Sequence, residues 1–143
     1  LMNTWILVAD GSRANLFARD NGGRLEKLEG WDNPEGRLAE SESESDSLGS
    51  ARPGSSMTPP TDPKRHSQEV FARQMAAVLK ERCSAYDRLL LVAAPKFLGD
   101  LRQQLDQSVQ KKIAADFAKD LAELSAHELG PHLDKLMETM TPT

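Results

Sequence analysis

A short, wholly apolar segment near the middle of the chain limits the possible folds more than any other feature. Residues 89–94 are LLLVAA, and Pro95 ends the run. The run is too short for a buried helix, and apolar side chains on both faces suit a central parallel strand covered by helices on each side. Pro95 suits the first turn of a helix, where its missing N–H costs nothing. The segment therefore predicts an α/β sheet with a strand-to-helix junction around Ala94, Pro95 and Lys96.

Antiparallel strands are expected near the start of the chain. The segments TWILVAD and ANLFAR flank a tight turn in which Asp10 and Gly11 tolerate positive φ, so they predict a hairpin. Asn21-Gly22-Gly23 is a second turn signal, and RLEKLEGW after it predicts a third strand. The apolar alternation of this third strand slips between Leu25 and Leu28, which is typical of a β-bulge.

The composition changes from residue 32 to about residue 64. This stretch is rich in Ser, Glu, Gly and Pro and has almost no large apolar side chains. It therefore cannot bury enough apolar surface to offset the conformational entropy that it would lose on folding. It predicts a flexible insertion within a single domain of residues 2–143, and residues 35–62 are expected to be mobile. The acidic run ESESESD within it suits either a solvated linker or the attraction of a basic partner.

Three amphipathic helices and one more strand are expected after the insertion. Ser67 is a suitable N-cap for the first helix, and the second begins at Pro95. Residues 112–118 alternate as a strand, although a helix fits almost as well. Ser125 and Glu128 form a capping box before the last helix, and Pro131 should kink or restart it. The helix faces expected to be buried contain Val70, Phe71, Met75, Val78 and Leu79, then Phe97, Leu98, Leu101 and Leu105, then Leu129, Leu133, Leu136 and Met140.

These elements predict the order β-β-β-α-β-α-β-α. Crossover connections between parallel strands are right-handed, so the apolar strand at residues 89–93 should pair in parallel with the first strand. The prediction is a mixed five-stranded sheet with helices on its faces.

The overall composition excludes several classes of protein. The chain has 143 residues with 18 Lys and Arg against 22 Asp and Glu, a net charge of −4, so nucleic acid could bind only through a local patch. A single cysteine, Cys83, allows no disulfide within the chain. The apolar run from Trp5 to Ala9 is too short for a signal peptide or a membrane span. We expect a cytoplasmic protein with no membrane segment.

Three segments together resemble a known family. WILVADGSRANLFA, LLLVAAPKFLGDLRQQL and KDLAELSAHELGPHL are similar to the bacterial host attachment proteins, with APKFLGDLR the most specific element. That family is distantly similar to the central domain of translation release factors, so the resemblance implies a ribonuclease H-like fold and a role on the ribosome or RNA. Release factors need a Gly-Gly-Gln loop for peptide release, whereas Gly22-Gly23 is followed here by Arg24. The resemblance therefore implies neither peptide release nor any catalytic residue.

The fold implied by the resemblance makes a metal-dependent nuclease the main alternative. Two-metal nucleases need converging carboxylates, and Asp10 lies at the right strand end. The expected partner strand ends instead at Ala93-Ala94, and Asp100 lies a full turn into the helix, where solvation or the helix dipole explains it. Asp10 is better explained as a turn residue that accepts backbone hydrogen bonds. The histidines are not spaced as metal ligands, and neither a metal nor a cofactor is expected; they are His66, His127 and His132.

The strand-to-helix junction is the best candidate for a binding surface. Ligands of open α/β sheets gather at the carboxyl ends of parallel strands, and the helix start with Lys96 could hold an anion. We expect the junction to lie beside the first turn, and Arg102 to pair with Asp106 within its helix.

The favoured function is a non-enzymatic interaction domain with an unknown protein or ribonucleoprotein partner; the oligomeric state is not predicted. The candidate surface consists of Asp10, Gly11, Ser12, Arg13, Pro95 and Lys96.

Overall fold

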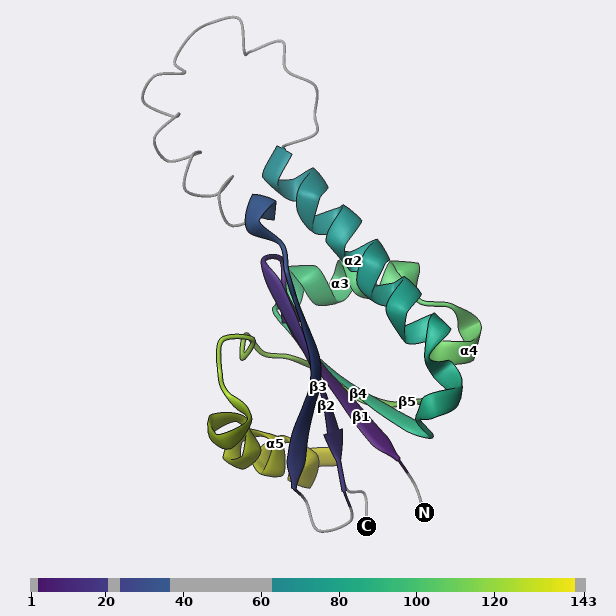
Figure 1. The fold of residues 1–143 in the computed structure, drawn as a ribbon, viewed down its shortest axis with the longest axis vertical. Coiled ribbons are helices and arrows are strands. Elements are labelled where there is room, and N and C mark those ends of the chain that lie inside the picture. Colours follow the sequence, from purple (N-terminus) through teal and green to yellow (C-terminus); the bar gives the residue numbers. More distant parts are fainter. Residues whose placement is uncertain (1–2, 21–23, 37–62, 141–143) are drawn as a thin grey trace, which may run out of the picture.

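The computed structural model describes residues 3–20, 24–36 and 63–140 (Figure 1). Strands and helices follow the predicted order, with short additional helical segments that include η2 and α4. Residues 112–118, for which a helix fitted almost as well, contain a strand. The elements are β1 (Thr4–Asp10), β2 (Arg13–Arg19), β3 (Leu25–Asp32), α2 (Pro63–Glu81), η2 (Cys83–Ala85), β4 (Arg88–Ala93), α3 (Pro95–Gln104), α4 (Gln107–Gln110), β5 (Ile113–Ala118) and α5 (Ala126–Met140).

The five strands form one mixed sheet in the order β3-β2-β1-β4-β5. Strand β2 is antiparallel to both β1 and β3, whereas β4 lies parallel to β1 and β5 parallel to β4. The predicted parallel pairing is confirmed, with Ala9 opposite Ala93 at its last position. As a result β1, β3, β4 and β5 all end at the same edge of the sheet, which we call the carboxyl edge.

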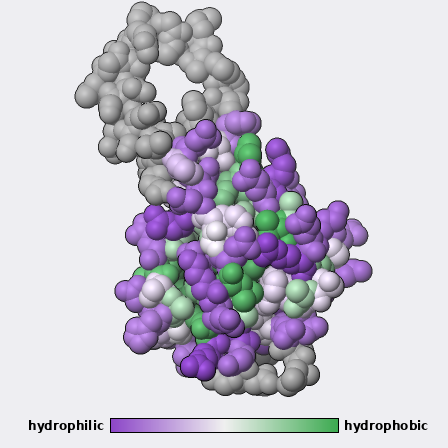
Figure 2. All heavy atoms as spheres, viewed as in Figure 1, coloured by the Kyte–Doolittle hydropathy of each residue, from purple (hydrophilic) through white to green (hydrophobic). Residues whose placement is uncertain are grey.

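Helices cover both faces of the sheet, as the apolar run of β4 requires (Figure 1). Residues 89–93 are buried whichever face they point to. One core cluster joins the sheet to α2 and α3, and a second joins it to α5. Burial on both faces makes β4 the centre of the fold, because its side chains contribute to both clusters. Hydrophilic side chains cover most of the surface seen in Figure 2, with hydrophobic ones in small separate groups.

The predicted irregularity in the third strand is a β-bulge. Glu29 lies opposite Leu16 and Lys27 lies opposite Phe17, so Leu28 is an extra residue on β3. The bulge leaves the Leu28 side chain 39% exposed. Leu25 before the bulge packs against the core cluster on the α5 side, and Trp31 after it packs against the cluster on the other face.

One predicted helix feature is wrong, and one is narrowed. Ser67 is not an N-cap, because α2 begins at Pro63 and Ser67 lies in its second turn. Its hydroxyl instead contacts the Asn33 side-chain amide at 3.1 Å. Pro131 lies inside α5, which continues from Ala126 to Met140, so the helix does not restart there, while the predicted kink stays a prediction. The predicted capping box is confirmed, with Ser125 N donating to Glu128 Oε1 at 3.0 Å and Glu128 N to Ser125 Oγ at 3.2 Å.

The structure narrows the predicted insertion at both ends. Strand β3 includes Asp32, a helical turn follows at residues 34–36, and α2 already begins at Pro63. Gly36 is buried and its N–H donates to Asn33 O at 3.0 Å. Residues 37–62, which include the acidic-serine run, lie outside the described residues, so the expected mobility stays a prediction.

Two charged side chains of α3 have partners other than those predicted. Arg102 pairs with Asp116 of β5, with 2.5 Å between Nη2 and Oδ1, and not with Asp106, which caps α4. Asp100 is neither solvated nor engaged only with the helix dipole, because Arg65 of α2 binds both its oxygens. Each pair joins two elements that are distant in sequence.

Candidate functional site

The first turn at the carboxyl edge is closed by the Asp10 carboxylate. Its Oδ1 atom accepts hydrogen bonds from Ser12 N at 2.8 Å, Ser12 Oγ at 3.1 Å and Arg13 N at 2.9 Å. Aspartate stabilises turns in this way because its short side chain reaches the backbone two and three residues ahead. Asp10 therefore has the turn role that the sequence predicts.

Gly11 does not have the positive φ that the turn signal suggested, and it packs closely against a side chain of α2. A Cβ atom here would lie 2.5 Å from the side chain of Gln68 on α2. The Gly11 carbonyl accepts a hydrogen bond from Asn33 Nδ2 at 2.8 Å. The turn is thus held between the end of β3 and the first turns of α2.

The strand-to-helix junction begins beside this turn. Ala94 N donates to Ala9 O at 3.2 Å, which extends the pairing of β1 with β4 one residue past the end of β4. Ala94 then has an extended backbone, with ψ of 145°, and Pro95 begins α3. Pro95 and Lys96 are both exposed. The expected proximity of the two strand ends is therefore observed, while binding at this surface is not tested.

A carboxylate that the sequence analysis missed is electrostatically coupled to the first turn. Asp120 follows β5 and lies close enough to Asp10 and Arg13 to interact with both charges. Its pKa is raised above the usual value, chiefly by burial and then by repulsion from Asp10 and Glu123, while Arg13 lowers it. Asp120 and Glu123 lie in the connection from β5 to α5, more than 100 residues after Asp10, so no local pattern could reveal this proximity.

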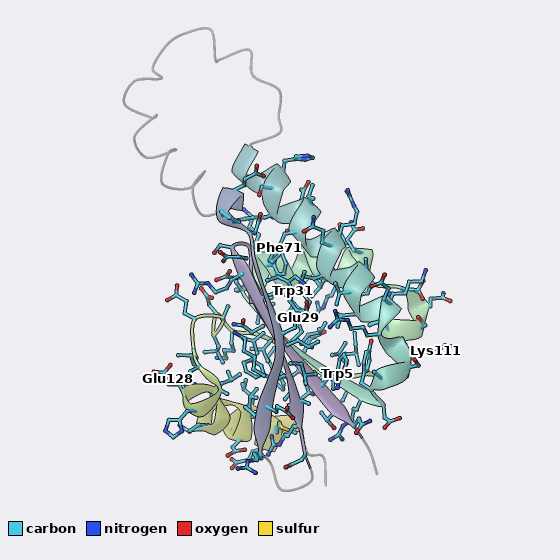
Figure 3. All side chains as sticks on the ribbon, viewed as in Figure 1. Trp5, Glu29, Trp31, Phe71, Lys111 and Glu128 are labelled. Carbon is cyan, nitrogen blue, oxygen red and sulfur yellow. The ribbon has the colours of Figure 1, made fainter. Side chains whose placement is uncertain are left out.

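An open hollow of about 580 Å³ lies beside Arg13, on the sheet face that carries α5. Its floor is formed by the start of β2 and by β3, and it includes Arg13, Asn15, Lys27, Gly30 and Asp32. The connection before α5 and the first turn of this helix form its wall, and Figure 3 labels Glu128 there. The wall is held to the floor by a hydrogen bond of 3.1 Å from Asn15 Nδ2 to Ala122 O.

The hollow includes only part of the candidate surface that the sequence predicts. Arg13 lines it, but Lys96 is not among its lining residues. The Nε atom of Arg13 is buried and has no hydrogen-bond partner among the described residues. A signal for the hollow was present in the sequence, because a glycine inside a strand, here Gly30, often marks a close approach.

No helix in the part of the chain described here is long and apolar enough to cross a membrane. Within the same residues, no group of three or more His, Cys, Asp or Glu side chains is placed to hold a metal ion.

Comparisons with solved structures give distant similarities. The chain matches the ethanolamine utilization protein EutJ from Carboxydothermus hydrogenoformans with a TM-score of 0.45 and 10% identity, over 91% of this chain and 49% of that one. It matches the Aquifex aeolicus Ppx/GppA phosphatase with a TM-score of 0.37 and 10% identity, over 82% of this chain and 35% of that one.

Sequence comparison identifies the family. An uncharacterized protein of Rickettsia prowazekii (strain Madrid E) is 33% identical over 75 residues, which are 50% of this chain and 50% of that protein. The chain thus spans about half the length of this curated relative. The family model described as "Protein required for attachment to host cells" matches residues 5–133, which include all the strands apart from Thr4 and the first half of α5. The chain belongs to this host attachment family.

Proposed function

We propose that this chain is a non-enzymatic, cytoplasmic interaction domain that binds its partner at the carboxyl edge of the sheet. The observation that carries the proposal is the parallel pairing of β1 with β4, which brings the turn at residues 10–13 beside the start of α3. Open α/β sheets bind ligands at such an edge. Lys96 is exposed there and forms no ion pair within the described residues, on a chain whose net charge is −4.

We infer that a ribosome or another RNA-containing particle is the partner to test first. The inference rests on the distant similarity of the host attachment family to the release-factor central domain and on the ribonuclease H-like arrangement that this similarity implies. A phosphate backbone would supply the anions that an exposed lysine at a helix start can contact. Such contacts are salt-sensitive, because binding releases counterions from the nucleic acid.

The test is cosedimentation of the purified protein with ribosomes at low and high salt. Lys96→Glu should weaken cosedimentation, whereas Lys111→Glu should not, because Lys111 is equally exposed but precedes β5 at the opposite edge of the sheet. Equal binding by both variants would place the interface elsewhere. Absence of cosedimentation by the unaltered protein would remove the ribosome as partner.

A metal-dependent nuclease is the second candidate, and one observation favours it. The sequence offers no carboxylate at the end of β4, but Asp120 approaches Asp10 from the end of β5. An observation against the nuclease is that one oxygen of Asp10 already accepts hydrogen bonds from three donors of the turn. We expect no hydrolysis of RNA or DNA with Mg²⁺ or Mn²⁺. Metal-dependent cleavage that is lost in both Asp10→Asn and Asp120→Asn would establish the nuclease instead.

A further inference from the structure

The two outer strands of the sheet differ in how well their free sides are protected against another strand. Strand β3 has a bulge at Leu28 in its middle and charged side chains on both sides of the bulge. Charges and bulges of this kind discourage pairing with a further strand. Strand β5 has its bulge at Ala114, close to its start, and then runs regularly from Ala115 to Ala118. No strand pairs with its outer side in the part of the chain that the structure describes. The free side of β5 is therefore more open to a further strand than that of β3.

The side chains of β5 alternate between the two faces of the sheet. Ala115 and Phe117 pack against the core cluster on the α5 side. Asp116 points to the other face, where Arg102 of α3 binds its carboxylate, and Ala118 on that face is exposed. The acidic group of this strand is thus already paired, and its neighbours are small or apolar. The strand lacks an unpaired charge that would keep a second strand away.

The apolar side chains of β5 are incompletely covered on the α5 side. Helix α5 contacts β3, which lies at the opposite end of the strand order. Ala115 and Phe117 are only half-buried. A continuation of the sheet past β5 would cover more of these two side chains, and the apolar area removed from water would stabilise the association.

We propose that two copies of this chain pair their β5 strands antiparallel, which joins the two sheets into one continuous sheet. The contact has a two-fold axis perpendicular to the sheet, the commonest symmetry of oligomers. This axis keeps the α5 faces of both copies on the same side. Residues that lie opposite each other must therefore point to the same face, so one residue of β5 lies opposite itself.

Three registers of this pairing are unfavourable. With the axis at Asp116, two carboxylates lie directly opposite each other, and like charges at opposed positions destabilise a strand pair. With the axis at Ala118, Asp116 of one copy faces Asp120 of the other, with the same effect. With the axis at Ala115, the pairing extends into the bulge at Ala114, where the ladder is disrupted.

The register centred on Phe117 is self-complementary. The two Phe117 rings lie opposite each other, and cross-strand aromatic pairs stabilise a sheet. Asp116 of each copy faces the small side chain of Ala118 of the other copy and keeps Arg102 as its ion-pair partner. This fit of the strand to itself identifies a second copy as the occupant.

Sedimentation velocity of the whole chain over a range of concentrations tests the pairing. We expect a reversible equilibrium in which the mass rises with concentration from that of one chain toward that of two. A single monomeric species at every concentration would overturn the proposal. Assemblies that keep growing beyond the dimer would also overturn it, because a two-fold contact closes at two copies.

Substitutions of the exposed Ala118 test the register. Ala118→Glu places a carboxylate opposite Asp116 of the second copy, and two such contacts arise by symmetry. The dissociation constant of the dimer should therefore rise about tenfold. Ala118→Lys places an ammonium group at the same position and should leave the dimer at least as tight. Equal weakening by the two substitutions would contradict the register, since only the sign of the charge differs between them.

The matched control for these variants is Ala77→Glu. Ala77 is also an exposed alanine, but it lies on α2 and not on the sheet, so this substitution should leave the dimer unchanged. Thermal melting of each variant shows that it is folded. Weakening of the dimer by Ala77→Glu as large as that by Ala118→Glu would refute pairing through β5. Lys96 is unaltered throughout, so this proposal and the proposed function can fail separately.

Discussion

At the scale of single residues, the carboxylate at the end of β1 has a structural role. Asp10 uses one oxygen to hold Ser12 N, Ser12 Oγ and Arg13 N, and this turn begins β2. The same residue repels Asp120 across the carboxyl edge. Asp10 therefore stabilises the hairpin and also influences the protonation of a distant side chain.

Removal of the Asp10 acceptor should destabilise the turn. Asp10→Ala leaves the Ser12 and Arg13 amides without their acceptor, and we expect a loss of about 1–2 kcal/mol in the free energy of unfolding. Asp10→Asn keeps an acceptor oxygen and should lose less. Urea denaturation of both variants measures the difference. Equal losses would show that charge, and not the acceptor, is what stabilises the turn.

Removal of the Asp120 charge should stabilise the protein at neutral pH. The pKa of Asp120 is raised above 3.8, so the folded state holds this proton more tightly than the unfolded state. The resulting stability is present at low pH and is lost as pH rises through the raised pKa. Asp120→Asn should therefore be more stable than the unaltered protein above this range and should show no such advantage well below pH 3.8.

Urea denaturation across this pH range tests the prediction. The control is Glu138→Gln, which removes an exposed carboxylate from the last turns of α5. A constant stability difference between Asp120→Asn and the unaltered protein at every pH would contradict linkage through this proton.

At the scale of elements, ion pairs that the sequence does not predict join the helices of one layer. Arg65 and Asp100 connect α2 to α3 through a two-pronged contact, with 2.6 Å from Nη1 to Oδ2. Their side chains are only 28% and 11% exposed. Partial burial weakens solvent screening, and the planar guanidinium matches both carboxylate oxygens. This pair therefore contributes more than an ordinary surface ion pair.

A double-mutant cycle should show strong coupling between Arg65 and Asp100. We expect Arg65→Ala and Asp100→Ala to interact by about 1 kcal/mol in the free energy of unfolding. The control cycle uses Lys80 and Asp106, which are 3.6 Å apart and more exposed, and its coupling should be smaller. Denaturant unfolding of the two sets gives both values. Equal coupling in the two cycles would mean that the paired geometry adds nothing.

At the scale of the whole molecule, the residues on either side of the long intervening segment are held at the same place. A Cβ atom on Gly36 would lie 2.5 Å from Gly11 O, and the Gln68 side chain packs against Gly11 from α2. Asn33 also contacts Ser67 directly. The first turn therefore anchors the chain both before residue 37 and after residue 62.

Replacement of residues 37–62 by a short Gly-Ser linker should preserve the fold. The anchors on both sides lie within the domain, and shortening a connection reduces its closure entropy only slowly. We expect a nearly constant melting temperature, and cleavage of the unaltered chain first within this span under limited proteolysis. Unfolding of the shortened chain, or resistance of the span to protease, would show that the segment contributes to the core.

The order of the strands and helices follows from the sequence because its signals are local. Alternation, capping and turn chemistry act between residues a few positions apart, so they predict the hairpin, the bulge near Leu28 and the Ser125–Glu128 box. The wholly apolar run at residues 89–93 likewise predicts a strand covered on both faces. Parallel pairing with β1 follows from chain handedness and holds in the structure.

Only the tertiary structure decides which distant side chains meet. The sequence places Arg102 one helical turn from Asp106, yet Asp116 of the neighbouring strand is its partner. It places Asp120 far from Asp10, and it contains no local pattern that brings Glu123 and Arg13 to line the same hollow. Such contacts depend on sheet order and on the path of the connection before α5, where packing and not local preference determines the geometry. The sequence alone therefore determined the elements and the buried strand, and folding determined the charges that share one site.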